Sequence, residues 1–447
     1  MSKNKEKKED FGFKEIYEKV PDGFYEKCGF FILSTMIILL VVEGAYRLIV
    51  PSAYFNLYIN LYYVVGGAGE IFAIFYVLSA FYGREKFDFK GLIKNHIWDV
   101  FLLLMLVWAV ISSLSAEDRY LAMYGTLYRK DGLLTYFVYA AMYVCGRAVT
   151  SKKYRLLLFR IMAYSVSSLS IITVIQYFKV FKPFYESRQR NFKYCMEYSG
   201  IYNNTNHFAY LMTMGIMCLV VLVVVEKNKA LRSVAGITLA FNIWSLIVND
   251  TFGCYLAVLF GGLFGCVLFA FRGKKYFVRA LAAMGIVILV SACMNFVNGR
   301  VVANMSVTYK DAGNITSDDE AGSGRIKLWK YGIKYITEKP VLGYGPEGLG
   351  NKYFGDGCLN DRPHNEYIQY AAFLGIPALI FYLGALITIF IHCIKRVKSL
   401  PEWIMGAGIL VFAYCVSAFF GNTMHNTTVY YFVFLGILSS CYIKEKE

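Results

Sequence analysis

His364 stands in a short polar segment, Asp361-Arg-Pro-His-Asn-Glu366, directly before an apolar stretch that begins near Tyr367. An imidazole has a near-neutral pKa, and here it would lie beside carboxylates and a guanidinium at the edge of an apolar region. This combination suits a general base that takes a proton from an attacking hydroxyl group. Proline followed by polar residues is also common at the start of a helix, so helix capping is the alternative interpretation.

Arg325 is the second candidate, because it follows two glycines in Gly322-Ser-Gly-Arg325 and opens an amphipathic stretch. Backbone amides at a helix start bind anions, and a guanidinium placed there can add a forked pair of hydrogen bonds. The lysines that follow it are interpreted as a solvated face of the same helix. The sequence therefore favours Arg325 over these lysines as an anion contact.

Two neighbouring patterns have simpler interpretations. Gly343-Tyr-Gly-Pro-Glu-Gly348 matches the spacing of a dinucleotide-binding loop, but no strand precedes it and Pro346 lies inside it, so a tight turn is expected. Asp318-Asp319-Glu320 is interpreted as an acidic loop tip, since no further oxygen ligands stand at the spacing of a metal site. We therefore expect neither a metal nor a cofactor.

Two asparagine-rich runs also precede apolar segments, Tyr202-Asn-Asn-Thr-Asn-His207 and Gly421-Asn-Thr-Met-His-Asn426. Their side chains, among them Asn206 and His207, could cap helices or form hydrogen bonds with sugar hydroxyl groups. Nothing local decides between these two interpretations, and both stay open.

A membrane domain must position these residues. Hydrophobic residues make up 57% of the 447-residue chain and charged residues only 17%, and the apolar residues form long blocks. A helix needs about 20 mostly apolar residues to cross a bilayer, so an all-α polytopic membrane protein is predicted. The expected spans, twelve in all, lie at about Gly29–Val50, Leu57–Tyr82, Ile97–Ser115, Leu133–Val149, Leu156–Phe181, His207–Val225, Ser233–Val248, Phe252–Phe271, Phe277–Val297, Tyr367–Ile394, Trp403–Phe420 and Thr428–Ile443.

The formal net charge of +15 is explained by membrane orientation, so no nucleic-acid partner is expected. With both termini in the cytoplasm, the short cytoplasmic segments all carry lysine or arginine, whereas the short outer loops 51–56, 249–251 and 421–427 carry none. The expected organisation is a basic cytoplasmic lead (1–28), a nine-span membrane domain (29–297), an extracytoplasmic catalytic loop (298–366) and a three-span C-terminal membrane part (367–447).

Several motifs follow one another from about Leu114 to the C-terminus: Tyr128-Arg-Lys-Asp-Gly-Leu-Leu134, Ile201-Tyr-Asn-Asn-Thr-Asn-His-Phe-Ala-Tyr-Leu211, Gly322-Ser-Gly-Arg325, Lys339-Pro-Val-Leu-Gly-Tyr-Gly345, His364-Asn-Glu-Tyr-Ile-Gln-Tyr370 and Leu374-Gly-Ile-Pro377. Their order and their twelve-span setting resemble the O-antigen ligase and O-antigen polymerase superfamily. The resemblance implies a GT-C-like, metal-independent, inverting glycosyltransferase in the plasma membrane. It would use a polyprenyl-diphosphate-linked glycan donor and a glycan acceptor on the outer face, among membrane lipids.

The resemblance also implies roles for single residues. In that family a loop histidine acts as base and loop arginines hold the diphosphate, which assigns these roles to His364 and Arg325. Family members often carry an arginine where Phe252 stands here, so this phosphate contact is missing or moved. The candidate substitutes are Arg129, Arg188 and Arg190. The remaining candidate substrate contacts are Asn206, His207, Asn365 and Glu366.

Three functions fit these observations. A polymerase would join lipid-linked repeats into a cell-surface polysaccharide, and a ligase would transfer the glycan to a different acceptor. A transporter of lipid-linked oligosaccharide would also have many spans, but it should show repeated halves and discontinuous helices near the middle of the membrane. The sequence shows no internal repeat, and no dedicated protein-acceptor region is visible, so the polymerase is the leading interpretation.

Overall fold

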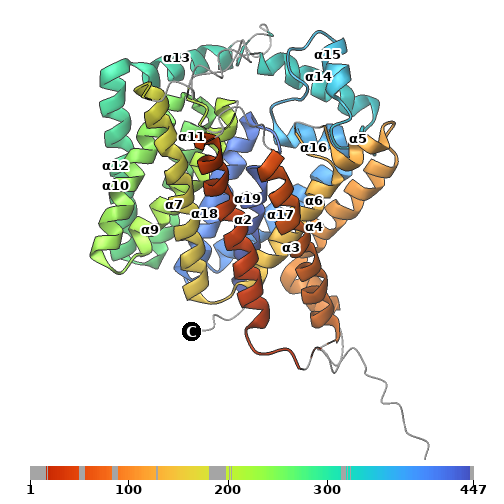
Figure 1. Cartoon of the computed structure of the whole chain (residues 1–447), viewed down its shortest axis with the longest axis horizontal. Coiled ribbons are helices and arrows are strands. Elements are labelled where there is room, and N and C mark those ends of the chain that lie inside the picture. The colour runs from red at the N-terminus through yellow and green to blue at the C-terminus, as the bar shows by residue number, and fades with distance from the viewer. Residues whose placement is uncertain are drawn as a thin grey trace, which may run out of the picture.

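The computed structural model describes residues 17, 19–49, 56–82, 89–126, 129–180, 198–200, 202, 204–313, 319, 321–322 and 324–442. Within these ranges the regular secondary structure is entirely helical (Figure 1). The helices are α2 (Phe24–Ile49), α3 (Asn56–Tyr82), α4 (Phe89–Leu114), α5 (Arg119–Tyr124), α6 (Leu133–Ala148), α7 (Lys152–Tyr177), α9 (Thr205–Val225), α10 (Lys229–Asn249), α11 (Phe252–Arg272), α12 (Lys274–Asn298), α13 (Arg300–Gly313), α14 (Arg325–Glu338), α15 (Gly350–Gly355), α16 (Glu366–Leu374), α17 (Ile376–Lys395), α18 (Glu402–Ser417) and α19 (Thr428–Ser439), with short 3₁₀ turns at Ala418–Phe420 and Ser440–Tyr442.

Ten of the described helices are long and apolar enough to cross a membrane, so the chain is an all-α, multi-pass membrane protein. The predicted number of twelve spans is not confirmed. Helices α6 and α19 coincide with predicted spans, but they contain 16 and 12 residues, fewer than the roughly 20 that a full crossing needs. They pack against each other inside the bundle, where neighbouring helices cover them.

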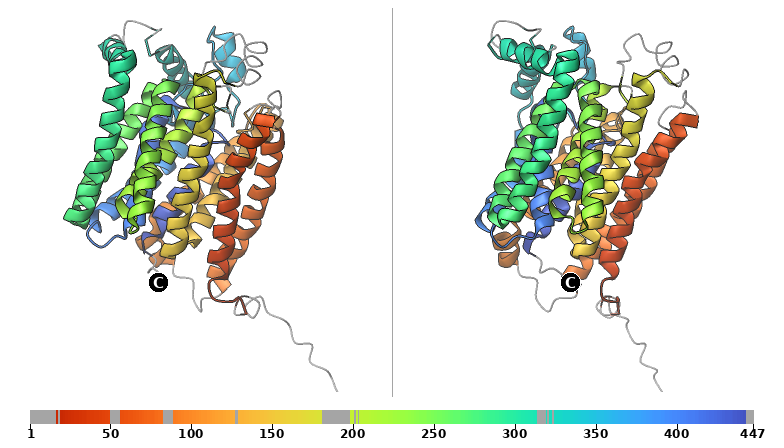
Figure 2. Two further views of the ribbon diagram at one scale, coloured as in Figure 1. Left: turned by 60° about the vertical axis from the view of Figure 1, so that its left-hand side comes forward. Right: turned by 90° about the vertical axis from the view of Figure 1, so that its left-hand side faces the viewer.

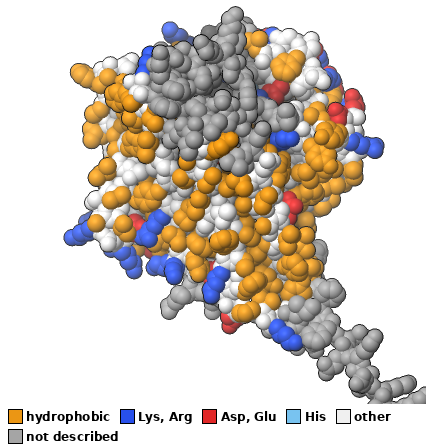
Figure 3. All heavy atoms as spheres, in the orientation of Figure 1, with side chains coloured by type: hydrophobic (Ala, Val, Ile, Leu, Met, Phe, Trp, Pro, Cys, Tyr) orange, Lys and Arg blue, Asp and Glu red, His pale blue; other side chains and the backbone are white. Residues whose placement is uncertain are grey.

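The long helices run side by side, and short helices gather at one end of the bundle (Figures 1 and 2). We call this end, which carries α5 and α13 to α16, the loop end. We call the opposite end, where α9 is joined to α10 and α11 to α12, the basic end. Lysine and arginine side chains line much of its rim below a belt of hydrophobic side chains (Figure 3). Helix α9 lies at the centre of the bundle, because the whole of its most apolar stretch is buried by other helices.

The single span predicted at Tyr367–Ile394 is wrong, because the chain breaks there into α16 and α17. Gly375 lies at the break with a φ of 90°. Residues 340–345 cross the break, and their backbone pairs with the groups that the break leaves open. Tyr344 N–H donates to the carbonyl of Ala372 (3.2 Å), and Ile376 N–H donates to the carbonyl of Pro340 (2.8 Å). The break therefore joins the loop end to the membrane helices without leaving these backbone groups unpaired.

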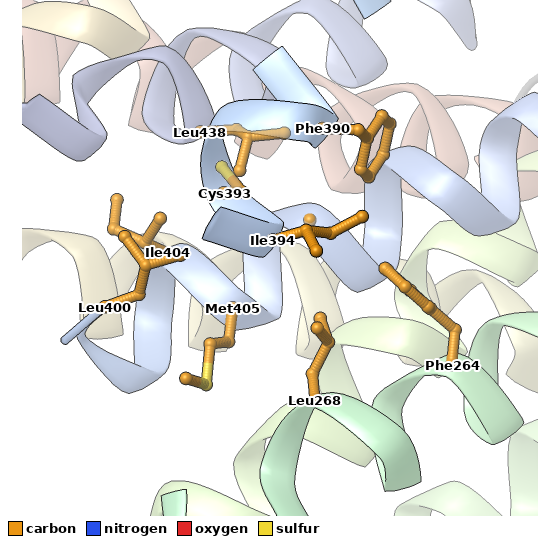
Figure 4. A pocket seen from close by; sticks show the side chains of 10 residues that line it. Phe264, Leu268, Phe390, Cys393, Ile394, Leu400, Ile404, Met405 and Leu438 are labelled. Carbon is orange, nitrogen blue, oxygen red and sulfur yellow. The ribbon is translucent and has the colours of Figure 1, made fainter. Parts of the chain in front are cut away.

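A small cavity lies near the basic end, between α11, α17, α18 and α19 (Figure 4). Its volume is about 10 Å³, and its lining is apolar, with Phe264, Phe390 and Ile404 among the side chains. A space of this size and polarity has no partners for a bound sugar or phosphate. The candidate residues Arg325 and His364 lie at the other end of the bundle.

The conformation of Gly375 at the break leads to a prediction about the thermal stability of the protein. Gly375→Ala should lower the melting temperature of the purified protein, because a φ of 90° costs a residue with a side chain about 1–3 kcal/mol. The added Cβ would also fall against the carbonyl oxygen of Val341. Gly285→Ala is the control, because nothing lies within 4 Å of a Cβ at that helical position. Equal melting temperatures for the two variants would contradict the structural role of the break.

Candidate functional site

Three loops that are distant in sequence meet at the loop end, and the buried side chain of Arg362 joins them. Its guanidinium lies 3.1 Å from the carboxylate of Asp131 and 3.8 Å from that of Glu347. It also donates to the backbone carbonyl of Thr423 at 3.4 Å. The side chains of Arg362, Asp131 and Glu347 are 1%, 0% and 1% exposed. We call these three residues with Asp361 the Arg362 cluster.

Charge pairing keeps Arg362 and Asp361 ionised. Burial disfavours a charged guanidinium, but Asp361, Glu347 and Asp131 outweigh burial and hold the pKa of Arg362 above its ordinary value. Burial likewise disfavours the carboxylate of Asp361, but Arg362 and Arg129 outweigh it and hold the pKa of Asp361 below its ordinary value. Arg362 and Asp361 therefore keep their charges at neutral pH, whereas burial raises the pKa of Asp131 above its ordinary value.

Arg129 belongs to the same assembly of charges. Its Nε and Nη2 donate to the two carboxylate oxygens of Asp361, at 2.7 and 2.5 Å. Arg129 was predicted as a substitute contact to phosphate. The structure instead gives its guanidinium a forked ion pair within the protein, so much of its positive charge is already compensated.

Glu347 connects the glycine-rich motif to this assembly. The Gly343–Gly348 segment forms a turn, as its sequence predicted, and Glu347 adopts a φ of 58° in it. The carboxylate of Glu347 accepts hydrogen bonds from the backbone N–H groups of Thr126 (2.8 Å) and Asp131 (2.6 Å). The motif thus binds the 126–131 backbone.

His364 lies two residues after Arg362 and is buried. Its backbone N–H donates to Oδ1 of Asn422 at 2.9 Å, so the amide nitrogen of Asn422 faces Nδ1 of the ring, at 3.2 Å. An amide nitrogen can only donate, so Nδ1 accepts, and the neutral ring carries its proton on Nε2. Nε2 is buried and has no hydrogen-bond partner among the described residues.

The surroundings of His364 keep its ring neutral. Burial, followed by the positive charges of Arg325 and Arg129, lowers the pKa of His364 to about 3. A negatively charged ligand between these arginines would offset their charge and raise this pKa again. An anion bound beside these two arginines would therefore make His364 a stronger base.

His425 is a candidate that sequence reasoning did not select. Its Nδ1 lies 2.8 Å from the backbone carbonyl of Arg129, which can only accept, so Nδ1 carries the proton. Nε2 therefore presents a lone pair, and it is buried without a hydrogen-bond partner among the described residues. Burial lowers the pKa of His425 to about 4. The deciding contact joins residues 296 positions apart, so no local pattern in the sequence could have revealed it.

Helix capping, the alternative interpretation of the His364 segment, applies to the next residue, Asn365. Asn365 is the N-cap of α16, and its side-chain oxygen accepts from the N–H groups of Tyr367 (3.0 Å) and Ile368 (3.1 Å). Glu366 follows it and is buried, with one carboxyl oxygen accepting from the Tyr414 hydroxyl group at 2.6 Å. Burial raises the pKa of Glu366 to about 8, so this carboxyl group is mostly protonated at neutral pH.

Arg325 is the first residue of α14, after Gly324 with a φ of 77°. Its Nη1 donates to the carbonyl of Gly322 at 3.4 Å, and no carboxylate among the described residues forms an ion pair with it. Two lysines of the same helix differ, because Lys330 and Lys334 are paired with Asp319 and Asp356. Arg325 is thus the basic residue of α14 best placed to bind an external anion near His364.

The other predicted contacts divide into two groups. His207 is buried at the start of α9 and lies within electrostatic range of His364 and Arg129, so it belongs to the same end of the bundle. Asn206 precedes it, and its backbone N–H donates to the capping side chain of Asn204 at 2.8 Å. Arg188 and Arg190 lie outside the described residues.

Residues 237–383 match the model of the O-antigen ligase family. The chain carries an O-antigen ligase domain. The match supports the resemblance of the chain to the superfamily of O-antigen ligases and polymerases and indicates glycan transfer in the synthesis of cell-surface polysaccharides. No curated protein and no solved structure matches the chain.

The O-antigen ligase domain and the site overlap only in part. Arg325, Arg362 and His364 lie within the matched residues, whereas the groups that complete their surroundings, Asp131 and Asn422, lie outside them. The candidate site is therefore assembled from the matched residues together with loops on both sides of them in the sequence.

Arg362→Met tests the Arg362 cluster. Removing the guanidinium leaves Asp131 and Glu347 as uncompensated buried carboxylates, which should cost about 3–5 kcal/mol of folding free energy. We expect a clear fall in the melting temperature of the purified protein. Lys330→Met is the matched control, since it removes one charge from an exposed pair worth about 0–1 kcal/mol. Equal melting temperatures for the two variants would show that the cluster does not stabilise the loop end.

Proposed function

We propose that this chain is a polymerase that joins lipid-linked oligosaccharide repeats into a cell-surface polysaccharide. The donor glycan is carried on a polyprenyl diphosphate, and the acceptor is a second lipid-linked glycan. Transfer takes place without a metal at the outer face of the plasma membrane, and both termini lie in the cytoplasm. In this arrangement residues 298–366 form the extracytoplasmic catalytic loop between the nine-span and three-span membrane parts.

The observation that carries the proposal is that His364 and Arg325 lie within electrostatic range of each other at the loop end. A buried, neutral imidazole with an unpartnered Nε2 lies within electrostatic range of a guanidinium that no described carboxylate compensates. A guanidinium can bind the negatively charged diphosphate, and a neutral imidazole can take the proton from a hydroxyl nucleophile. The O-antigen ligase domain contains both residues.

In the proposed reaction, an acceptor hydroxyl oxygen attacks the anomeric carbon of the donor sugar. The bond from that carbon to the diphosphate oxygen breaks, and polyprenyl diphosphate leaves with the electron pair. His364 takes the hydroxyl proton, while Arg325 stabilises the negative charge that develops on the leaving group. A single displacement inverts the configuration at the anomeric carbon. The negative charge of the donor also raises the pKa of His364, so the base becomes stronger when the donor is bound.

Asn422 sets a condition on the base role. In the described arrangement its amide nitrogen donates to Nδ1, which leaves the proton of the neutral ring on Nε2. For Nε2 to accept a proton, the amide of Asn422 must turn so that its oxygen faces Nδ1. If the amide keeps its orientation, Nε2–H instead donates to the substrate, and His425 presents the lone pair.

The polymerase is favoured over a ligase because the loop end contains no separate domain for a protein acceptor within the described residues. The length of the glycan on the lipid carrier distinguishes the two functions in cells. Loss of a polymerase leaves single repeats on the lipid carrier, whereas loss of a ligase leaves long chains there. Lipid-linked glycans from cells with an inactive variant should therefore be single repeats.

His364→Ala and Asn422→Asp together test the base. His364→Ala should lower transfer by about 10²–10⁴, the usual contribution of a positioned general base. Asn422→Asp should retain activity within about tenfold, since a carboxylate accepts from Nδ1–H and leaves the lone pair on Nε2. Polymer length in cells and the rate of donor consumption by purified protein would measure both effects.

His392→Ala, at the basic end, is the control for losing a histidine, and protein level should stay equal across the series. A loss of activity in Asn422→Asp as large as in His364→Ala would contradict the base role and assign Nε2–H as a donor to the substrate. Near-normal activity of His364→Ala with strong loss in His425→Ala would move the base to His425.

Arg325→Ala should weaken the binding of polyprenyl diphosphate, used without a sugar as the probe, by about 10- to 100-fold. This is the size expected from a hydrogen bond between charged groups. Arg325→Lys should recover binding only in part, because an ammonium group lacks the planar fork. Lys330→Ala in the same helix is the control, because Lys330 is already paired with Asp319. Unchanged binding in Arg325→Ala, or loss of transfer with a metal chelator, would contradict the proposed phosphate contact.

A further inference from the structure

A groove of about 500 Å³ opens between α10 and α12, far from the loop end. The two helices lie side by side at the edge of the bundle (Figures 1 and 2). Most of the lining is apolar and faces outward, with Ile237 72% and Leu289 64% exposed. Arg232 and Arg279 line the same groove near the first turns of the two helices, at the basic end.

The two arginines form a like-charged pair within electrostatic range of each other. Arg279 is held in place, because its Nη1 donates to the carbonyls of Val224 (2.8 Å) and Glu226 (3.2 Å) at the end of α9. Nη1 of Arg232 is buried and has no hydrogen-bond partner among the described residues. Two adjacent guanidinium groups of this kind favour an anion between them.

Nearby carboxylates do not provide that anion. The carboxylate of Glu226 is paired with Arg160 at 2.5 Å, and that of Glu402 is paired with Arg272 at 3.2 Å. The other neighbouring charges at the starts of α10 and α12 are lysines, which add positive charge. The pair Arg232 and Arg279 therefore keeps a net positive charge beside an apolar surface.

The length of the groove indicates how long the apolar part of a bound ligand would be. The lining on α12 runs from Arg279 to Val290, which is roughly 16 Å at a rise of 1.5 Å per residue. Half of a hydrocarbon core about 30 Å thick is of similar length. A ligand with its anionic group at the arginines would thus place its apolar chain along the groove as far as the middle of the membrane.

We propose that this groove binds an anionic glycerophospholipid from the leaflet at the basic end. The lipid phosphate lies between Arg232 and Arg279, and one acyl chain lies along the apolar lining. A second copy of the protein fits less well, because it would bring its own basic rim to the same level. The lipid would hold the edge helices α10 and α12 together through a surface that the protein leaves open.

The test uses the full-length protein purified in a mild detergent, with bound lipid counted by native mass spectrometry. Phosphatidylglycerol is the probe, and phosphatidylcholine with the same acyl chains is its neutral counterpart. We expect preferential retention of phosphatidylglycerol, with the apparent affinity at least about tenfold lower in Arg232→Ala/Arg279→Ala. Lys274→Ala/Lys275→Ala should behave as the wild type, because these exposed lysines of α12 do not line the groove.

Gly236→Leu tests the apolar part while keeping both arginines. A Cβ at Gly236 would lie 3.5 Å from Ile286, which is ordinary contact, so the remaining leucine atoms would extend into the groove. We expect reduced retention with an unchanged melting temperature in lipid-free detergent. The proposal would be overturned by equal retention of the two lipids or by unchanged retention in both groove variants. It would also be overturned if free glycerol 3-phosphate competed equally well, or if the protein formed a dimer that both groove variants dissociate.

Discussion

The loop end depends on one buried guanidinium. Arg362 is enclosed by Asp131, Glu347 and its neighbour Asp361, which come from three loops, and it reaches a backbone carbonyl in a fourth. A buried charge is stable only when its partners are in place, and each buried carboxylate in turn requires the guanidinium. The loops therefore cannot separate without a large cost in free energy. The geometry around His364 follows from this mutual requirement.

His364 is held between two anchors on the same segment. Arg362 lies two residues before it, and Asn365, which caps α16, lies directly after it. His364 itself adopts a φ of 51°, a conformation that needs support from its surroundings, and Asn422 supplies a hydrogen bond to its backbone. The candidate reacting group thus lies on a loop, yet its position is fixed by buried side chains and by the start of a helix. Such support preorganises the candidate site at the loop end.

The membrane helices could be predicted from sequence because their signals are local. Apolar blocks gave the positions of the spans, and glycine before Arg325 marked a helix start. The break at Gly375 was missed because hydropathy is continuous across Tyr367–Ile394. Gly375 ends α16 and Pro377 lies at the start of α17, and the backbone of residues 340–345 pairs with groups that the break leaves open. The protonation pattern of His425 depends on the carbonyl of Arg129, and the charge of Arg129 is compensated by Asp361. These pairings exist only in the folded chain, so residue types alone could not distinguish between the candidate arginines or between the histidines.

The contact between His364 and Asn422 has a consequence for biosynthesis. A ribosome makes the chain from its N-terminus, so α17 and everything before it can enter the membrane while α18 and α19 are still being made. At that stage His364 lacks Asn422, and Arg362 lacks the carbonyl of Thr423. The segment between α18 and α19 delivers both groups as these two apolar helices insert. The surroundings of His364 and Arg362 are thereby completed only after α18 and the segment that follows it have been made.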